Sequence, residues 1–244
     1  MASQPPSNED VRIEVITDPS DFEAAYDVTA NAFGHQTKDG IWMAMNPDWD
    51  QPAGKAKNVA QLRDRWQATK AGGNTTFIKA TLPDPAVEGS RVIAGLAIWL
   101  HASAIPGQGE VPGKIDFTSV YPDNERERRY VTQLLTSLHK NRYEVLRQIA
   151  QPESKQKSIM VLDLCVTDPA FQRRGVAKKL VQWGLDEAKR RGDLDAIIEA
   201  STMGRLAYEK VGFHQVGEIT YDVDEEFRDR RMPPNAFMRL RLPN

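Results

Sequence analysis

The stretch Phe171–Ala177, FQRRGVA, sets a glutamine and two arginines directly before a glycine, between an apolar segment and an amphipathic one. A helix N-terminus has unpaired backbone N–H groups and a partial positive charge, so it can bind an anion. Gly175 lets a ligand approach the main chain where a Cβ would obstruct it. Gln172, Arg173 and Arg174 add donors suited to phosphate oxygens. Alone, the stretch fits either an anion site at a helix start or a solvated turn.

Other phosphate-binding and metal-binding patterns are missing from the sequence. Neither G-x-x-x-x-G-K-[ST] nor G-x-G-x-x-G occurs, which argues against nucleoside triphosphate and dinucleotide sites of those types. The four histidines do not follow metal-ligand spacing, so no metal site is predicted. Cys165 is the single cysteine and has no signature of an activating base near it, so we expect a buried packing residue rather than a nucleophile.

The stretch FQRRGVA lies between two segments whose apolar residues follow different patterns. Residues 158–166 are apolar almost throughout and predict an interior strand. Residues 176–192 repeat apolar positions at helical spacing and end on a glycine, which predicts a helix. A further strand is predicted at 194–201 and a short helix at 203–211. This alternation is typical of α/β folds, so FQRRGVA is predicted to join a strand to a helix.

The remaining elements are predicted from the same patterns. Strands are expected at 11–17, 74–83, 90–102, 213–223 and 235–242, and helices at 18–33, with Asp18 as N-cap, and at 58–73, while 34–55 reads as irregular. Between 103 and 157, a loop rich in glycine and proline precedes residues 125–150, whose period predicts one long helix or a helical pair. No repeat or linker divides the chain. We therefore expect a single domain at 1–244, with a flexible tail at 1–10 and an insertion at 103–157.

The C-terminal half resembles the GCN5-related N-acetyltransferase (GNAT) superfamily. QRRGVA at 172–177 and YEKVGF at 208–213 follow the apolar strand in the order and with the spacing of that family. The resemblance is strong over 159–222, moderate over the strands at 75–101 and weak elsewhere. It implies an α/β GNAT fold, with a mixed central sheet of about 6–7 strands flanked by helices and a helical insertion before the central strand.

The resemblance implies acetyl-CoA as co-substrate, bound within 159–222, and no metal. Main-chain groups of Leu164, Cys165 and Val166 would pair with the pantetheine arm like an added strand. Backbone N–H groups of the loop would wrap the pyrophosphate. The loop residues are Gln172, Arg173, Arg174, Gly175, Val176, Ala177 and Lys178. Ser201 stands where many members have asparagine, and would bond the pantetheine or cap the following helix.

The resemblance also implies a catalytic acid. Tyr208 matches the family's usual general acid, which protonates the departing CoA thiolate, and a packing tyrosine is the alternative. Ser201 and Tyr208 are seven residues apart, about two helical turns, so both face one ligand if the helix begins at Ser201.

Two acids are candidate general bases. Asp163 interrupts an apolar strand, where an acid is costly unless paired or functional. Strand alternation places it on the face of Val161 and Cys165. Some family members have a glutamate base at the position of Val161, so that role does not transfer directly. Glu199 is the second candidate, with a structural ion pair as its alternative role.

The acceptor is predicted from aromatic residues in the N-terminal part. Phe33, Trp42 and Trp49 are expected to wall a substrate pocket, although covering a core edge is an equal alternative. The expected function is transfer of acetyl from acetyl-CoA to the amine of a small molecule, by direct attack in a ternary complex. A peptide or protein N-acetyltransferase and a non-catalytic acyl-CoA-binding module are the alternatives.

The composition limits which binding partners and which cellular location we expect for the protein. A formal net charge of −2 over 244 residues gives no global basic field, which argues against nucleic acid. No apolar run approaches the roughly 18–20 residues that cross a bilayer, and the start lacks a signal-peptide pattern. A lone cysteine fits a reducing compartment. We therefore expect a cytoplasmic protein that is a monomer or a homodimer.

Overall fold

The computed structural model describes residues 10–103, 105–109 and 115–242. The tail predicted at 1–10 therefore lies outside the described residues, apart from Asp10. The chain forms one seven-stranded sheet in the order β1-β2-β3-β4-β5-β7-β6, which confirms the predicted mixed sheet. The strands are β1 (Arg12–Val15), β2 (Thr75–Pro83), β3 (Arg91–Ser103), β4 (Ser158–Thr167), β5 (Ala196–Ala200), β6 (His214–Glu218) and β7 (Ala236–Leu240).

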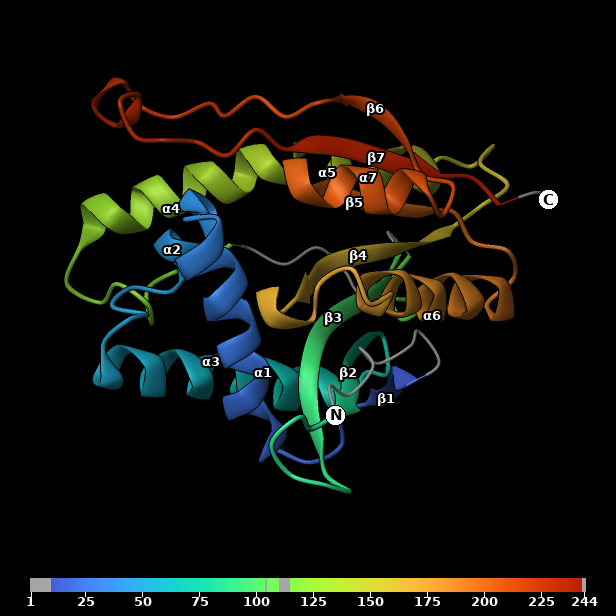
Figure 1. The fold of residues 1–244 in the computed structure, drawn as a ribbon. Helices are drawn as coiled ribbons and strands as arrows, with labels where there is room; N and C mark the ends of the chain where they lie inside the picture. Colours follow the sequence, from blue (N-terminus) through green and yellow to red (C-terminus); the bar gives the residue numbers. More distant parts are fainter. Residues whose placement is uncertain (1–9, 104, 110–114, 243–244) are drawn as a thin grey trace.

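Helices cover both faces of this sheet (Figure 1). They are α1 (Asp21–Thr29), the π-helix η2 (Ala30–Gln36), α2 (Gly40–Met45), α3 (Pro52–Lys70), α4 (Glu125–Leu138), α5 (Lys140–Ala150), α6 (Val176–Arg190) and α7 (Thr202–Glu209), with short 3-10 turns η3 (Pro169–Phe171) and η4 (Glu225–Phe227). Buried side chains of α1 and α3 pack on one face, and those of α5 pack on the same face beside them. The buried face of α6 and Tyr208 of α7 pack on the other.

Close contact between α6 and the sheet depends on one glycine. A Cβ at Gly184 would lie 1.9 Å from the Trp99 ring, so only glycine lets α6 lie against β3 at this point. The Trp99 indole N–H donates to the carbonyl of Leu180, at 3.2 Å. The middle of α6 is thereby held against β3.

The central strands part at their carboxyl ends. Among the strands that the structure describes, β4 and β5 are the only parallel neighbours, and Met160–Leu162 pair with Ala196–Ile198. Beyond Leu162 and Ile198 the two strands no longer pair, and the site residues predicted on both strands lie in this unpaired part. The remaining pairs in the sheet are antiparallel.

A bulge on β4 separates Asp163 from Cys165, which were predicted to share a face of the sheet. Ile98 of β3 pairs with Leu164 and Trp99 pairs with Leu162, so Asp163 is an extra residue without a partner on β3. Val161 and Leu164 lie on the face of α3 and α5, whereas Cys165 packs with α6 and Tyr208. Asp163 accepts from Arg65 of α3 and Arg142 of α5, so it shares the face of Val161 as predicted. The predicted shared face with Cys165 was wrong, because the bulge resets the alternation.

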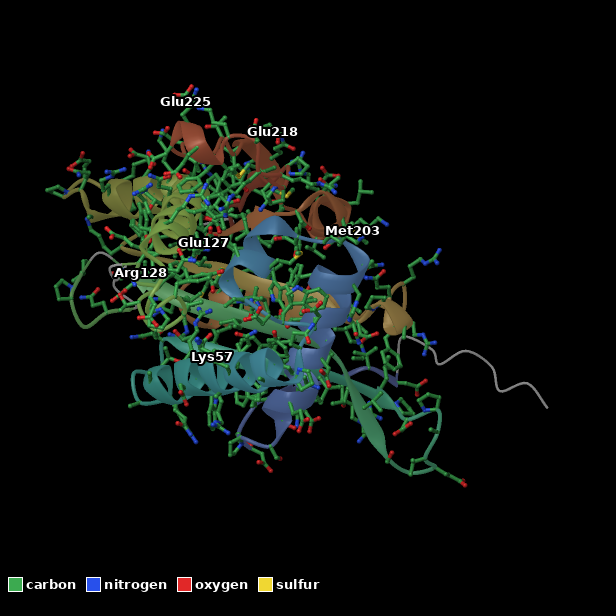
Figure 2. All side chains as sticks on the ribbon, turned by 90° about the vertical axis from the view of Figure 1, so that its left-hand side faces the viewer. Lys57, Glu127, Arg128, Met203, Glu218 and Glu225 are labelled. Carbon is green, nitrogen blue, oxygen red and sulfur yellow. The ribbon has the colours of Figure 1, made fainter. Side chains whose placement is uncertain are left out.

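The inserted segment is a pair of helices rather than one. α4 ends at Leu138 and α5 begins at Lys140, with His139 between them. The connection between β6 and β7 runs along α4 (Figure 1), and Arg230 in it donates to Glu127 of α4 at 2.6 and 2.7 Å. Glu127 is among the labelled side chains of Figure 2.

Two other predictions at the N-terminal end are corrected. α1 begins at Asp21 after Ser20, and Asp18 accepts from the Ser20 N–H instead of capping the helix. Residues 34–55, predicted as irregular, contain the end of η2, all of α2 and the start of α3. In the described residues, no helix combines the length and apolarity that crossing a bilayer requires.

Candidate active site

The junction between β4 and α6 presents free backbone donors. Gly175 has φ of 80°, in the left-handed region, and this conformation lets α6 begin at Val176 immediately after the loop. The Lys179 N–H donates to the Gly175 carbonyl at 3.0 Å. The preceding amides, of Val176, Ala177 and Lys178, therefore have no partner within the helix and point out of its N-terminus. This geometry fits an anion.

A cavity of about 430 Å³, here named the α6 cavity, lies over these amides. Of the residues predicted to bind acetyl-CoA, those that line it are Cys165, Val166, Gln172, Arg173, Gly175, Val176, Ala177, Lys178 and Ser201. Leu164 lines the neighbouring cavity instead, and Arg174 lies over the Phe171 ring, 5.4 Å from its centroid. Met203 of α7, exposed and labelled in Figure 2, lies on the opposite wall. The side-chain oxygen of Thr167, also in the wall, is buried without a hydrogen-bond partner.

A second cavity of about 520 Å³, here named the central cavity, occupies the gap between the parted strands. It is walled by β4 and β5, by Phe33 and Trp42 from the N-terminal helices, and by Phe117, His139 and Arg142 from the insertion. Trp49, predicted to be a third aromatic wall, is not among the lining residues. Its ring packs behind Trp42, with centroids 5.6 Å apart.

The two cavities meet at four residues: Phe33, Cys165, Ser201 and Tyr208. Ser201 is the N-cap of α7, and its hydroxyl accepts from the Gly204 N–H at 3.3 Å. Tyr208 follows two turns later on the same helix, as predicted from the spacing. A Cβ at Gly204 would lie 2.6 Å from the Tyr208 ring, so the glycine makes room for the ring at this junction.

The groups at the junction are uncharged. Burial, with the neighbouring Cys165, raises the pKa of Tyr208 well above its ordinary value. Burial likewise raises the pKa of Cys165 to about 12. The tyrosine therefore keeps its proton at neutral pH and can donate it, whereas the cysteine stays a thiol and is a poor nucleophile. Cys165 is half-buried and lines both cavities, so its role as a packing residue stays a prediction.

Both candidate bases take part in one buried ion-pair network. Arg142 of α5 donates to Asp163 of β4 at 2.7 Å and to both oxygens of Glu199 of β5 at 2.5 and 3.2 Å. Arg65 of α3 donates to the other Asp163 oxygen at 2.7 Å. Burial alone would raise the pKa of Asp163, but the two guanidinium groups outweigh it and hold the pKa far below its usual range. Asp163 is therefore a weak proton acceptor.

His139 also faces this network across the central cavity. Burial, and next the charge of Arg142, lower the pKa of His139 from 6.5 to about 4. The imidazole is therefore neutral at neutral pH. It can accept or donate a hydrogen bond in the cavity without changing the charge there.

Sequence reasoning missed Arg142 and His139. Arg142 interrupts an otherwise apolar row of α4 and α5 that includes Leu138, Val145 and Ile149. A charged residue in such a row is the same signal that drew attention to Asp163. Among the described residues, no group of histidine, cysteine and acidic side chains is arranged to hold a metal ion.

Residues 134–227 match the family model described as "Acetyltransferase (GNAT) domain". No curated protein sequence matches the chain. Arylalkylamine N-acetyltransferase 2 from Aedes aegypti is similar over 96% of this chain and 99% of its own, with 18% identity and a TM-score of 0.55. A putative acetyltransferase from Salmonella typhimurium, solved with its cofactor acetyl-CoA, is similar over 96% and 95%, with 14% identity and a TM-score of 0.53. An apo agmatine N-acetyltransferase is similar over 96% and 100%, with 10% identity and a TM-score of 0.60. These likenesses confirm the predicted fold.

Proposed function

Because residues 134–227 match the family model of the GNAT acetyltransferase domain and the chain has the GNAT fold, we propose that this protein transfers acetyl from acetyl-CoA to the amine of a small molecule. The observation that supports the proposal is the meeting of two cavities at Tyr208. One cavity has anion-binding amides and the other is walled by aromatic rings. A donor and an acceptor that enter from the two sides would react where Tyr208 lies.

The α6 cavity fits the donor. The amides of Val176, Ala177 and Lys178 would bind the pyrophosphate, as anions bind at helix N-termini. The unpartnered hydroxyl of Thr167 and the end of β4 would bond the pantetheine arm, which would lie along the parted strand. Ser201, already used as the cap of α7, lies at the thioester end.

The chemistry is direct attack. The amine nitrogen forms a bond to the thioester carbon, and the C–S bond breaks as CoA leaves. The thiolate takes the proton of the Tyr208 hydroxyl, and water returns a proton to the tyrosine. The protein's main contribution is to hold both reactants in line.

We propose that neither Asp163 nor Glu199 takes the amine's proton. Arg142 and Arg65 occupy the Asp163 oxygens, and Arg142 occupies both Glu199 oxygens. A carboxylate held in this way is a partner for the arginines rather than a base. The amine then enters as the uncharged free base, and after its attack the nitrogen loses a proton to water in the cavity. We therefore expect kcat/KM to rise with pH as the fraction of free amine increases.

Replacing Tyr208 with Phe tests the assignment. We expect kcat to fall by roughly 10²–10⁴, the usual contribution of a positioned acid, with the acetyl-CoA Kd within about twofold. Release of the CoA thiol over a panel of amines measures the first, and calorimetry the second. Full turnover by Tyr208→Phe at neutral pH would show that another group is the acid.

The same measurements separate the rival functions. Acetyl-CoA binding without thiol release on any amine or peptide would favour a non-catalytic acyl-CoA-binding module. Release with peptides alone would favour a peptide or protein N-acetyltransferase. No binding of acetyl-CoA would refute the donor assignment itself.

A further inference from the structure

The charges that line the central cavity do not balance. The two carboxylates of Asp163 and Glu199 are matched by the two guanidinium groups of Arg142 and Arg65. Asp39 and Asp116 line the same cavity, and no salt bridge in the described part of the chain includes Asp39. After the network is neutralised, the described lining of the central cavity therefore has no further cation to match the negative charge of Asp39.

Asp39 has a structural role that uses half of its carboxylate. It is the N-cap of α2, and its Oδ1 accepts from the N–H groups of Ile41 and Trp42 at 3.0 and 2.8 Å. Burial raises the pKa of Asp39, and these two N–H groups only partly offset the effect. A half-buried carboxylate in this state is stabilised by any cation that reaches it.

Asn235 provides a second, independent sign of a missing ligand. Its residue is 7% exposed, and its Oδ1 is buried without a hydrogen-bond partner. Its main-chain groups are used, because its N–H donates to the Pro233 carbonyl and its carbonyl accepts from the Ile219 N–H. An unpaired buried acceptor costs free energy comparable to a lost hydrogen bond. A ligand that donates a hydrogen bond to the Asn235 side chain would remove this cost.

Asp39 and Asn235 lie between the same two cavities. Both line the central cavity, and both line an adjoining cavity of about 210 Å³ between α2, the start of α7 and the residues before β7. Lys38 and Arg231 line this adjoining cavity but not the central one. These two cations lie on the adjoining side, so a cationic ligand in the central cavity would approach Asp39 from the side of the aromatic walls.

We propose that Asp39 and Asn235 bind an ammonium or guanidinium group of the acceptor, so that the substrate has a second cationic group besides the amine that is acetylated. Both side chains offer oxygen acceptors, which such a group satisfies with its N–H donors, and the Asp39 carboxylate selects for positive charge. Phe33 and Trp42 would cover the carbon chain between the two nitrogens. This inference rests on the proposed function and adds the substrate class.

Two substitutions test the subsite. Asp39→Asn removes the charge but keeps an equally good N-cap, and Asn235→Leu removes the acceptor at similar volume. The substrates are 1,4-diaminobutane and n-butylamine, which differ in the second nitrogen. Asp186→Asn, on the exposed face of α6 and bonded to Gln182, is the matched control for loss of a negative charge.

We expect wild-type kcat/KM to favour diaminobutane over butylamine by at least about tenfold, as for one charge-assisted hydrogen bond. Asp39→Asn should reduce this ratio by roughly 10–100-fold and Asn235→Leu by roughly 5–10-fold, while Asp186→Asn leaves it unchanged. Calorimetry with acetyl-CoA verifies that each variant is folded.

The outcomes are distinct. A wild-type ratio near one, or a ratio that both variants leave unchanged, overturns the subsite while the proposed function stands. If acetyl-CoA binds and no amine releases thiol, the proposed function fails instead. The subsite is then judged by thermal shift: diaminobutane should raise the Tm of the wild type and not of Asp39→Asn, and equal shifts would overturn it.

Discussion

The α6 cavity and the central cavity share a wall but are built from different parts of the chain. The α6 cavity is lined by the end of β4, by the loop and helix start at Gln172–Lys178, by α7 and by part of η2, and its candidate anion donors are the backbone N–H groups of the one continuous run Gln172–Lys178. The central cavity draws on the N-terminal helices, the insertion and the ends of β4 and β5, and its polar groups are side chains. A site made of backbone N–H groups requires only the local turn and helix start that expose them. A site made of side chains requires that each of the elements carrying them is correctly placed.

This contrast predicts unequal responses to single substitutions. In the α6 cavity, removing a loop side chain should weaken acetyl-CoA binding less than changing the backbone conformation. In the central cavity, removing one buried side chain should disturb both strands at once.

The largest effect is expected from Arg142→Met. The substitution leaves Asp163 and Glu199 facing one another with only Arg65 as a cation, and breaking a buried ion pair from one side costs about 3–5 kcal/mol of unfolding free energy. Arg147→Met on the same helix, whose pair with Glu144 is exposed, should cost less than about 1 kcal/mol. Urea unfolding measures both. Equal losses would show that the network contributes no more than a surface pair.

The next effect concerns pH and His139. Since the folded protein holds the pKa of His139 near 4 rather than 6.5, the unfolded chain binds a proton in that window that the folded protein does not. The free energy of unfolding should therefore fall as the pH drops from 6.5 to about 4, by at most about 3 kcal/mol.

His139→Gln should remove this part of the slope, and His214→Gln, at an exposed position, should not. Asp163 has a lowered pKa, so its stabilising contribution is lost only below its ordinary pKa of about 4, outside this window. Urea titrations at several pH values measure the slope. An unchanged slope in His139→Gln would mean that the imidazole does not need to be neutral for folding.

The smallest effect is expected in the α6 cavity. Gly175→Ala forces a Cβ into a left-handed conformation, at roughly 1–2 kcal/mol, and should weaken acetyl-CoA binding about tenfold. Arg174→Ala, whose side chain lies over Phe171, should change the Kd less than about threefold. Calorimetry compares them. A larger loss in Arg174→Ala would show that side chains rather than amides hold the phosphates.

The same contrast explains what the sequence could predict. The order of β4, α6, β5 and α7 and the position of Tyr208 relative to Ser201 follow from periodicity and from motifs within one segment, so they were predicted. The helix at Ser201 is fixed by a local cap, which a short stretch of sequence specifies.

The central cavity could not be predicted in this way. Arg142 meets Asp163 and Glu199 across 21 and 57 residues of sequence, and neither separation has a periodic signal. Trp49 has the residue type of a pocket wall, yet its ring occupies the space over Gly34, where a Cβ would lie 2.5 Å from it. The bulge at Asp163 depends on the partner strand, so no pattern within β4 alone specifies it.

The orientation of Phe33 depends on how many residues the π-helix η2 contains. In this segment the Thr37 N–H donates to the Ala32 carbonyl five residues earlier, at 3.0 Å, so a turn holds one residue more than in an α-helix. Phe33 lies within it and lines all three cavities. Losing one residue between Thr29 and Phe33 would restore α-helical pitch and rotate Phe33 by about 100°. The aromatic wall is therefore set by the count of residues in one helix, and a deletion that leaves every other side chain intact would turn it away from the reaction site.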